Sequence, residues 1–418
     1  MGSIKKISMI ILISFTLFLA ACSENSSQNN DTSSISKYSQ GVTDSEILIG
    51  HVDPQSGPAA AYDLIRKGID SYFSYINENG GVNGRQLKLI AYDDQYQPAK
   101  TVQFTKKLVE EDKVFALVGF GTSAGVAAAQ DYLVEKGIPM VMLGAASSEF
   151  VNPPIKNFLG SASLNYNIEA KIFLNYAVEK LGAKKIAIAF QNDTFGKNGY
   201  DAVKEEISKY PGVEIVEEVP FLATDTEFSS HAQKLKEAEP DAILTFALAN
   251  PAANLKKAMH KVGVTEPAYI VTGVGANDPN LFNLAGTDVW EGTYSGAVFP
   301  MPDVAPDNEH IKLFVEQLGK YYPNDPAAGL AQIGWGEAQV LVEALKRAGD
   351  DLTWENLISS LYTFDNWDGS IYEAVTFSEN NHYGLTSNFM TQAQDGKILP
   401  VTEKITFDPS TGEIQYSN

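Results

Sequence analysis

The chain has 418 residues, with 31 Lys and Arg against 52 Asp and Glu, which gives a formal net charge of -21 at pH 7. Such acidity argues against a nucleic-acid partner and against electrostatic attraction to anionic lipid. Cys22 is the only cysteine, so no disulfide can form within the chain and a hydrophobic core must hold the fold.

The N-terminus has the layout of a bacterial export signal. Lys5 and Lys6 precede an almost wholly apolar run over residues 7–19, and the sequence Leu19-Ala20-Ala21-Cys22 follows. A basic start, a short apolar run and small residues before a cleavage point are typical of a secretory signal, and the run is too short to span a bilayer comfortably. The last four residues resemble a lipobox, in which the cysteine is lipidated and becomes the first residue of the mature protein.

We therefore predict a lipoprotein signal peptide at residues 1–21, a lipid anchor at Cys22 and an extracytoplasmic location at the cell membrane. The alternative is an ordinary secretory signal with an incidental cysteine. Residues 22–42 are rich in Ser, Asn, Gln and Asp and contain little to bury, which predicts a disordered tether. The remaining residues, about 375 of them, suggest two domains.

From residue 46 onward, short apolar runs alternate with longer amphipathic segments, which is typical of α/β layers. In residues 59–79, for example, Ile65, Ile69 and Phe73 recur at four-residue spacing on one helical face. The predicted strands are residues 46–50, 86–92, 114–118, 138–143, 185–190, 213–219, 242–247 and 268–272. The predicted helices are residues 59–79, 99–111, 126–136, 168–181, 199–210, 229–237, 252–262, 309–318 and 334–348. Short β segments are predicted at residues 374–377, 391–394 and 404–407, among Asn- and Gly-rich turns.

The glycine-rich segment at residues 119–125 lies between a predicted strand and a predicted helix, and it suits two kinds of enzyme. Gly121-x-Ser123-x-Gly125 matches the nucleophile elbow of serine hydrolases. Gly119-x-Gly121-x-x-Ala124 loosely fits a dinucleotide fingerprint, although it follows the third predicted strand and no acid for a ribose ends the next one. A hydrolase would need a base from one of the later histidines, His231, His260, His310 or His382.

The same segment also suits a binding loop that performs no chemistry. Small residues at a helix N-terminus leave backbone N–H groups and the positive end of the helix dipole available to a carboxylate. Residues 144–148, Gly-Ala-Ala-Ser-Ser, repeat this arrangement after the next predicted strand. Two such loops at neighbouring strand ends form a cleft. The remaining alternative is that both loops are simply tight turns.

Several motifs occur together in an order that is more specific than any one of them. Ser56-Gly57-Pro58 is followed by Asn-Gly-Gly-Val-Asn-Gly at residues 79–84, by Tyr92-Asp93-Asp94 with Pro98, and by Gly137-Ile138-Pro139. From residue 46 to the C-terminus the chain resembles the leucine/isoleucine/valine-binding proteins of ABC importers, which have the type I periplasmic-binding fold.

This resemblance implies an α/β fold of two doubly wound βαβ lobes, joined by hinge crossings near residues 160–163, 294–299 and 374–378. Lobe 1 would contain residues 43–160 and 299–375, and lobe 2 would contain residues 161–298 and 376–418. The implied function is capture of a small-molecule ligand between closing lobes and its delivery to ABC permease subunits in the membrane. It implies a monomer that is not an enzyme and that needs no cofactor or metal.

The resemblance also assigns a candidate ligand site. Ser123 and the hydroxyl-bearing loop at residues 144–147, with Ser147 as the hydroxyl, would hold a ligand carboxylate, while Tyr62 and Phe195 would flank the ligand. A tyrosine of the family falls at Leu248, and the carboxylate that pairs with a ligand ammonium falls at Val274. The predicted ligand-binding residues are Tyr62, Thr122, Ser123, Gly144, Ala145, Ala146, Ser147, Phe195, Leu248 and Val274.

The missing acid bears on the identity of the ligand. A buried ammonium without an anion costs several kcal/mol, so either Asp193, Asp225 or Asp278 supplies the charge or the ligand has no ammonium. We expect a small carboxylate with an apolar or aromatic body, and an aliphatic amino acid as the second candidate. A ligand-sensing receptor with the same lobes and a Ser123 hydrolase are the alternative functions. The family's disulfide positions fall at Tyr96 and Thr122, so that bridge is absent.

Overall fold

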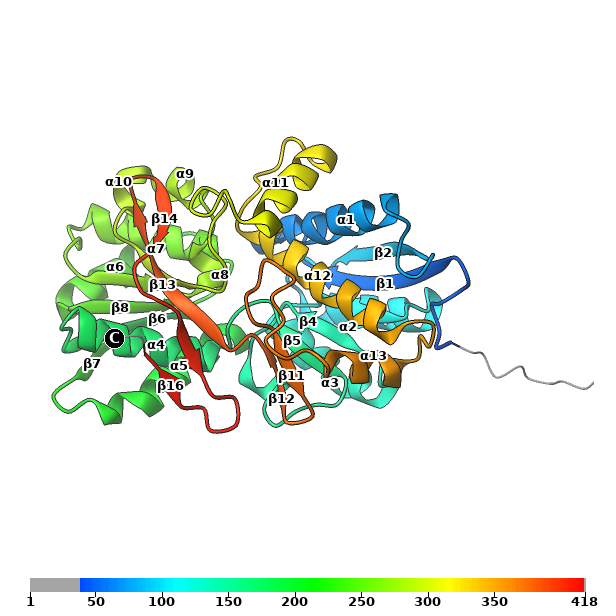
Figure 1. Cartoon of the computed structure of the whole chain (residues 1–418). Coiled ribbons are helices and arrows are strands. Elements are labelled where there is room, and N and C mark those ends of the chain that lie inside the picture. The colour runs from blue at the N-terminus through cyan, green and yellow to red at the C-terminus, as the bar shows by residue number, and fades with distance from the viewer. Residues whose placement is uncertain (1–37, 417–418) are drawn as a thin grey trace, which may run out of the picture. The chain divides into compact units, whose positions relative to one another are not determined.

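The computed structural model describes residues 38–416. The predicted signal peptide, Cys22 and most of the predicted tether lie outside the described residues. Figure 1 shows that the described part is built around two large β-sheets, each covered by helices, and a separate two-stranded sheet completes it. No helix within residues 38–416 combines the length and the apolar character needed to cross a membrane.

The first sheet has five parallel strands in the order β2-β1-β3-β4-β5. Its strands are β1 (Glu46–Asp53), β2 (Gln86–Asp93), β3 (Ala116–Val118), β4 (Met140–Leu143) and β5 (Phe158–Ser161). Because the strands are parallel, their carboxyl ends meet at one edge of the sheet, which is where open α/β sheets bind ligands.

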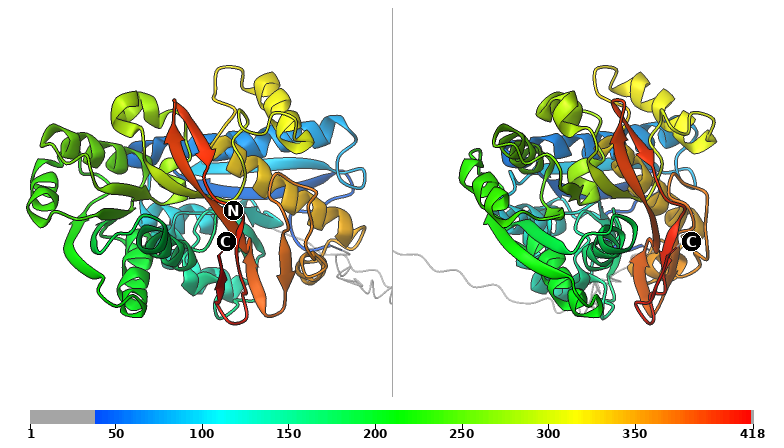
Figure 2. Two further views of the ribbon diagram at one scale, coloured as in Figure 1. Left: turned by 60° about the vertical axis from the view of Figure 1, so that its left-hand side comes forward. Right: turned by 90° about the vertical axis from the view of Figure 1, so that its left-hand side faces the viewer.

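The second sheet runs in the order β16-β15-β13-β10-β9-β8-β6-β7, with β14 paired to β13. Its strands from the middle of the chain are parallel: β6 (Lys185–Gln191), β7 (Glu214–Phe221), β8 (Ala242–Phe246), β9 (Ala268–Val271) and β10 (Tyr294–Ala297). The C-terminal strands, drawn in red in Figure 2, join it antiparallel to β10. They are β13 (Ser387–Gln394), β14 (Lys397–Pro400), β15 (Ile405–Phe407) and β16 (Ile414–Gln415).

Helices follow most strands. Those that precede β10 are α1 (Asp63–Glu78), α2 (Pro98–Lys106), α3 (Ser123–Lys136), α4 (Tyr166–Asn175), α5 (Thr194–Glu206), α6 (Ser229–Ala238), α7 (Ala249–Lys261), α8 (Gly273–Ala276), α9 (Leu281–Ala285) and α10 (Thr287–Trp290). Those that follow β10 are α11 (Glu309–Tyr321), α12 (Leu330–Ala348) and α13 (Trp354–Leu361). Single turns of other helix types extend several of them, including a 3-10 turn at Gly57–Tyr62 before α1.

Alternate residues of each strand face opposite layers of helices. In β1, Ile47 and Ile49 share a core with Ile69 of α1, whereas Val52 belongs to a second core with Leu133 of α3. Successive side chains of a strand point to opposite faces of the sheet, so helices cover both faces, as in doubly wound folds. The predicted α/β fold is confirmed, and each predicted helix and each predicted strand up to residue 272 overlaps an observed element.

Two short strands of the parallel parts of the sheets, β5 and β10, were not predicted, because their sequences lack the apolar runs of the other parallel strands. β5 contains Gly160, where a Cβ atom would lie 2.6 Å from Sδ of Met142. β10 reads Tyr-Ser-Gly-Ala and is almost fully buried. Both strands lead directly into crossings between the sheets, where small residues allow the backbone to pack closely.

The folded part of the chain begins at an earlier residue than predicted, and the third crossing between the sheets comes at a later residue than predicted. Gln40, placed in the tether, donates from Nε2 to the carbonyls of Val109 and Val114 at 3.1 and 3.0 Å, so residues 38–42 belong to the folded body.

His382, on the two-stranded hairpin of β11 (Thr376–Ser378) and β12 (Asn381–Gly384), hydrogen-bonds through Nδ1 to the carbonyl of Phe158 in β5 at 2.8 Å. The third crossing therefore lies at residues 385–387, about ten residues after the predicted position. The division into two lobes stays a proposal, with the third crossing moved to residues 385–387.

Helices α1 and α12 pack together unusually closely. A Cβ atom at Gly334 of α12 would lie 1.9 Å from the carbonyl oxygen of Ile65, and one at Gly68 of α1 would lie 2.1 Å from that of Ala331. These two glycines let the helix backbones touch and place Trp335 against Tyr72, with ring centroids 4.8 Å apart. The contact connects a helix from the first part of the chain to one that comes after β10.

We predict that Gly334→Ala destabilises the protein. Overpacking costs about 1–3 kcal/mol or more, which outweighs the gain of about 1 kcal/mol in helix propensity. Gly319→Ala is the matched control, because Gly319 also lies inside a helix but has no atom within 4 Å of its Cβ position. Urea unfolding should show a lower midpoint for the first variant and an unchanged or higher one for the second. Equal midpoints would contradict the close contact.

Two acids are buried in the first lobe without hydrogen-bond partners. Asp53 ends β1 and is 1% exposed, while Glu337 lies on α12 and is fully buried. No described residue hydrogen-bonds to either carboxyl group. Burial raises the pKa of both groups well above the usual range, and repulsion from Asp94 and, after it, from Glu337 raises the pKa of Asp53 further. Burial therefore favours the protonated form of both acids in the folded protein.

We predict that Glu337→Gln flattens the dependence of stability on pH. The folded state holds a proton that the unfolded chain releases above about pH 4.3, so this group's contribution is fully present below that pH. It falls by about 1.4 kcal/mol per pH unit as the pH rises towards the folded-state pKa. Urea unfolding at several pH values should show the variant gaining on the wild type as the pH rises, whereas Glu316→Gln on exposed α11 should not. A variant that is less stable at every pH would show that Glu337 is charged and paired.

Candidate functional site

The loop between β3 and α3 places Ser123 at the carboxyl edge of the first sheet. Gly119 and Gly121 have φ values of 56° and 74°, a left-handed conformation that favours glycine. Thr122 then caps α3, because its hydroxyl accepts a hydrogen bond from the N–H of Gly125 at 3.4 Å. Ser123 is the first residue of the helix and is 3% exposed. Its hydroxyl thus lies at the positive end of a 14-residue helix.

The loop after β4 lies directly beside it. The hydroxyl of Ser147 donates a hydrogen bond to Oγ of Ser123 at 2.9 Å. A Cβ atom at Gly144 would lie 2.8 Å from the carbonyl oxygen of Gly121, so only glycine fits at this close approach. The two loops that the sequence placed at neighbouring strand ends are therefore in contact.

One pocket collects most of the predicted residues. It encloses about 230 Å³ of space, part of it open to solvent, and its lining residues are Tyr62, Tyr96, Thr122, Ser123, Gly144, Tyr166, Phe195 and Leu248. Ala146 packs in the same apolar cluster, and Val274 packs against it. Ser147 hydrogen-bonds to Ser123, and Ala145 packs in a hydrophobic core that also contains Val126 of α3. Six of the ten predicted residues thus line the pocket itself, and three more adjoin it.

Sequence reasoning missed two aromatic residues of this pocket. Tyr166, the first residue of α4, packs its ring against Phe195 with centroids 4.8 Å apart. Tyr96 stands at one of the positions where the resemblance placed a family disulfide, the other being Thr122, and both line the pocket. The one indication of Tyr96 in the sequence was that the family's other disulfide position falls at Thr122, a predicted site residue.

Hydrogen bonds join the two lobes across this pocket. The hydroxyl of Tyr96 donates to Oδ2 of Asp193 at 3.0 Å, and the N–H of Ser148 donates to Asn198 Oδ1 at 3.1 Å. Asp193 also caps α5 through the N–H of Gly196 at 3.0 Å. Asp193 is one of the three acids considered as the partner of a ligand ammonium, and its carboxylate already accepts hydrogen bonds from Tyr96 and Gly196.

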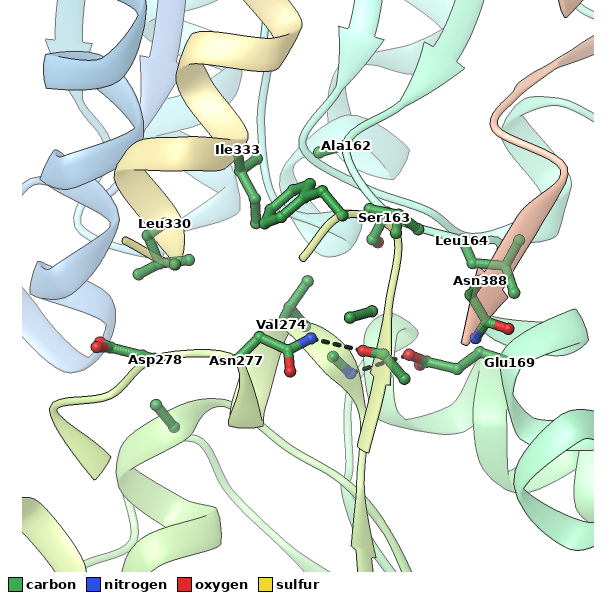
Figure 3. Close-up of a pocket in the computed structure, with 17 residues that line it drawn as sticks. Ala162, Ser163, Leu164, Glu169, Val274, Asn277, Asp278, Leu330, Ile333 and Asn388 are labelled. Atoms are coloured by element: carbon green, nitrogen blue, oxygen red, sulfur yellow. Dashed lines mark hydrogen bonds between the residues drawn. The ribbon is translucent and has the colours of Figure 1, made fainter. Parts of the chain in front are cut away.

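The other two acids differ in position. Asp225 accepts a hydrogen bond from the N–H of Leu222 at 2.8 Å within its own loop and lines neither pocket described here. Asp278 lines a second and larger pocket, which we call the hinge chamber and show in Figure 3. The hinge chamber encloses about 540 Å³, again partly open to solvent. Val274, which falls where the family has its acid, also lines it.

The ionisable side chains that line the two pockets are carboxyl groups and phenols. Within residues 38–416, neither the pocket at Ser123 nor the hinge chamber is lined by a lysine, arginine or histidine. Burial raises the pKa of Tyr62, Tyr96 and Tyr166, so these phenols keep their protons and can donate hydrogen bonds. In the same part of the chain, no group of acids, histidines or cysteines is arranged to hold a metal ion.

The histidines proposed as a hydrolytic base have other surroundings. His382 bonds to backbone carbonyls through Nδ1 and lies 3.0 Å from the hydroxyl of Tyr362 through Nε2. His231 packs beside Phe228, with ring centroids 5.3 Å apart. The hydroxyl of Ser123 hydrogen-bonds to that of Ser147, and the described residues show no serine–histidine pair at this loop.

Comparison with known proteins identifies the family. A sequence model described as periplasmic binding protein matches residues 46–397. A Leu/Ile/Val-binding protein homolog 3 from Brucella melitensis is 24% identical over 359 residues, which cover 85% of this chain and 93% of the relative. The Leu/Ile/Val-binding protein BraC3 from Rhizobium johnstonii is 24% identical over 355 residues, with 85% and 93% coverage.

Solved structures share the fold. The branched-chain amino acid binding protein LivJ of Streptococcus pneumoniae, in complex with isoleucine, has a TM-score of 0.73 at 24% identity and covers 84% of this chain and 97% of its own. A fatty acid ABC transporter substrate-binding protein from Thermomonospora curvata has a TM-score of 0.79 at 21% identity, with 90% and 96% coverage. A branched-chain amino acid ABC transporter protein of Thermus thermophilus with bound valine has a TM-score of 0.78 at 20% identity, with 88% and 98% coverage. With its two doubly wound sheets and a match over most of its length, the chain belongs to the periplasmic binding protein family.

Proposed function

We propose that this protein captures a small carboxylate-bearing ligand between its two lobes and delivers it to the permease subunits of an ABC importer. The ligand is a branched-chain amino acid or a related apolar or aromatic carboxylate. The observation that carries the proposal is the pocket at Ser123, where two hydroxyl-bearing loops and a helix N-terminus face aromatic and aliphatic side chains.

Each side of that pocket has a separate role in the proposal. Ser147 donates to Ser123, so the hydrogen of the Ser123 hydroxyl is left to donate to a ligand carboxylate. The dipole of α3 adds favourable electrostatics for an anion. Phe195 and Leu248 from the second lobe and Tyr62 from the first provide apolar surface for the ligand body. Ser123 then holds the ligand and does not attack it, so we propose no enzymatic step.

The relatives support a carboxylate more strongly than any one ligand. Their names and bound molecules include leucine, isoleucine, valine and a fatty acid. These molecules share a carboxylate and an aliphatic body, whereas only some carry an ammonium group. This range of ligands is consistent with a carboxylate-binding site on the first lobe and with residues on the second lobe that differ among the relatives.

We predict that Ser123→Ala weakens binding of carboxylate ligands such as leucine or 4-methylpentanoate. A hydrogen bond to a charged group contributes about 1.5–3 kcal/mol, so the dissociation constant should rise about tenfold or more. Isothermal titration calorimetry measures this directly. Ser229→Ala is the matched control, because Ser229 also begins a helix, α6, but is exposed and far along the chain from the pocket residues. Unchanged binding in Ser123→Ala would remove Ser123 from the site.

We also propose that the protein is held at the outer face of the cell membrane by lipid on Cys22. Membership of a periplasmic binding protein family implies an extracytoplasmic location. The Leu-Ala-Ala-Cys sequence at residues 19–22 supports the lipid anchor. Bacterial lipoproteins carry more than one acyl chain on the cysteine, and anchoring by more than one chain is stable.

We predict that Cys22→Ser abolishes membrane attachment without affecting ligand binding. In Triton X-114 phase partition of the protein made in a bacterial host, the wild type should enter the detergent phase and the variant should not. Ser23→Ala, next to the cysteine, is the control and should behave as the wild type. If both chains remain in the aqueous phase, the signal is an ordinary secretory one.

A further inference from the structure

The start of α5 in the second lobe is bonded to the first lobe at two points. Oδ2 of Asp193, which precedes α5, accepts a hydrogen bond from the hydroxyl of Tyr96 at 3.0 Å. Further along, Oδ1 of Asn198 accepts one from the N–H of Ser148 at 3.1 Å, and its Nδ2 donates to Oε2 of Glu149 at 3.0 Å. We call these three hydrogen bonds the interlobe clasp. They reach the loops after β2 and after β4, both of which line the smaller of the two pockets.

The first-lobe loop holds Tyr96 in a backbone conformation that side chains rarely adopt. Gln95 and Tyr96 have φ values of 56° and 60°, in the left-handed region that is uncommon for residues other than glycine. Their N–H groups donate to Oδ1 of Asp93 and to Oδ1 of Asp94, each at 2.9 Å, and the hydroxyl of Thr101 donates to Oδ2 of Asp94 at 2.6 Å. Such backbone strain persists only where the surroundings enforce it, and it clusters at clamps and switch regions. The two acids thus fix the loop from which Tyr96 reaches the second lobe.

The second-lobe side of the clasp is fixed to its own sheet. A Cβ atom at Gly196 would lie 2.2 Å from the carbonyl oxygen of Gln191 at the end of β6, and one at Gly199 would lie 2.2 Å from the ring of Phe246 in β8. These glycines let the first turns of α5 approach the sheet closely. Because α5 and the sheet are packed into one body, a rotation of the second lobe carries its half of the clasp with it.

The clasp is also bonded to residues that line the smaller pocket. Nε2 of Gln191 donates to the hydroxyl of Tyr96 at 3.2 Å and to Oδ2 of Asp193 at 3.0 Å. Oε1 of the same side chain accepts the N–H of Leu248 at 2.7 Å. Tyr96 and Leu248 both line the pocket, one from each lobe. Tyr96 therefore takes part both in the pocket and in the bonds that join the lobes.

We propose that the interlobe clasp holds the lobes closed over the ligand and sets how long the ligand stays bound. Tyr96 and Asn198 are then positioning residues for ligand retention. Every bond of the clasp joins one lobe to the other, so all three break when the lobes rotate apart. Two of them end on a carboxylate, which makes a hydrogen bond stronger. A ligand leaves through the open form, so the clasp slows its release. The inference rests on the proposed function for the ligand, whereas closure itself involves groups of the protein alone.

Two variants weaken the clasp and leave the apolar lining of the pocket in place. Tyr96→Phe deletes the hydroxyl and keeps the ring, and Asn198→Ala deletes an amide that lines neither pocket. Stopped-flow measurements with leucine as the probe should show a dissociation rate constant about tenfold higher in Tyr96→Phe, because its bond ends on a charged group. We expect a several-fold rise in Asn198→Ala, which is partly exposed, and little change in either association rate constant.

Two control variants make the same changes at hydrogen bonds that stay within one lobe. Tyr92→Phe deletes a hydroxyl that donates to Oδ2 of Asp112 at 2.9 Å in the first lobe. Asn175→Ala deletes an amide that donates to the hydroxyl of Tyr210 at 3.1 Å in the second lobe. Both should release leucine at the wild-type rate, because neither bond breaks when the lobes rotate.

Small-angle X-ray scattering of the purified protein without added ligand tests the clasp independently of any ligand. Removing a bond that exists only in the closed form shifts the balance towards the open form. Tyr96→Phe and Asn198→Ala should therefore have a larger radius of gyration than the wild type and both controls.

The outcomes separate the clasp from the proposed function. If both clasp variants keep the wild-type radius of gyration and release rate, the clasp does not hold the lobes and the inference is wrong. If only Tyr96→Phe releases leucine faster, at an unchanged radius of gyration, Tyr96 acts by touching the ligand and the inference is again wrong. If the wild type does not bind leucine, the proposed function fails for that ligand, and the scattering comparison alone then decides on the clasp.

Discussion

The close approach of two backbone loops at the edge of the first sheet is the constraint on which the site depends. Parallel strands β3 and β4 end side by side, and at Gly144 the loops come so near that a Cβ atom would meet the carbonyl oxygen of Gly121 at 2.8 Å. The glycines allow the contact, and the contact brings the Ser147 hydroxyl to Ser123 at the start of α3. The position of the hydroxyls is therefore set by backbone packing and not by flexible side chains.

The second lobe contributes a different kind of chemistry to the same cleft. The pocket at Ser123 offers hydroxyl groups and a helix N-terminus, which suit an anion. The hinge chamber offers carboxyl and amide oxygens on its second-lobe side, which suit a donor. Neither has a basic side chain among the residues that line it. A ligand with a negative and a positive end matches this polarity in one orientation only, so specificity can follow from the arrangement of partial charges.

Most of the first-lobe half of the site was predictable, because its residues are close in sequence to the ends of strongly patterned strands. Residues 119–125 and 144–148 carry the glycines and hydroxyls that such loops need, and the order of the strands made them neighbours. Glu169 and Asn388 could not be found in this way. In the sequence Glu169 resembles a solvated residue of an amphipathic helix, and Asn388 lies in a weakly patterned β segment. Their proximity depends on how the three crossings pack, and the third crossing was itself misplaced because the hairpin at residues 376–384 carries no local signal for the lobe that it joins.

The location of the hinge chamber has a consequence for how ligand binding is coupled to lobe closure. A ligand shifts the balance between open and closed forms only by the difference in its affinity for the two. The hydrogen bond from Tyr96 to Asp193 across the outer cleft joins two groups of the protein itself. The chamber is lined by Leu164, Val298 and Asn388, each of which lies in or next to one of the three crossings, so a rotation of the lobes would change its geometry. A ligand that contacts this chamber would therefore favour one arrangement of the lobes more strongly than a ligand that contacts only the pocket at Ser123.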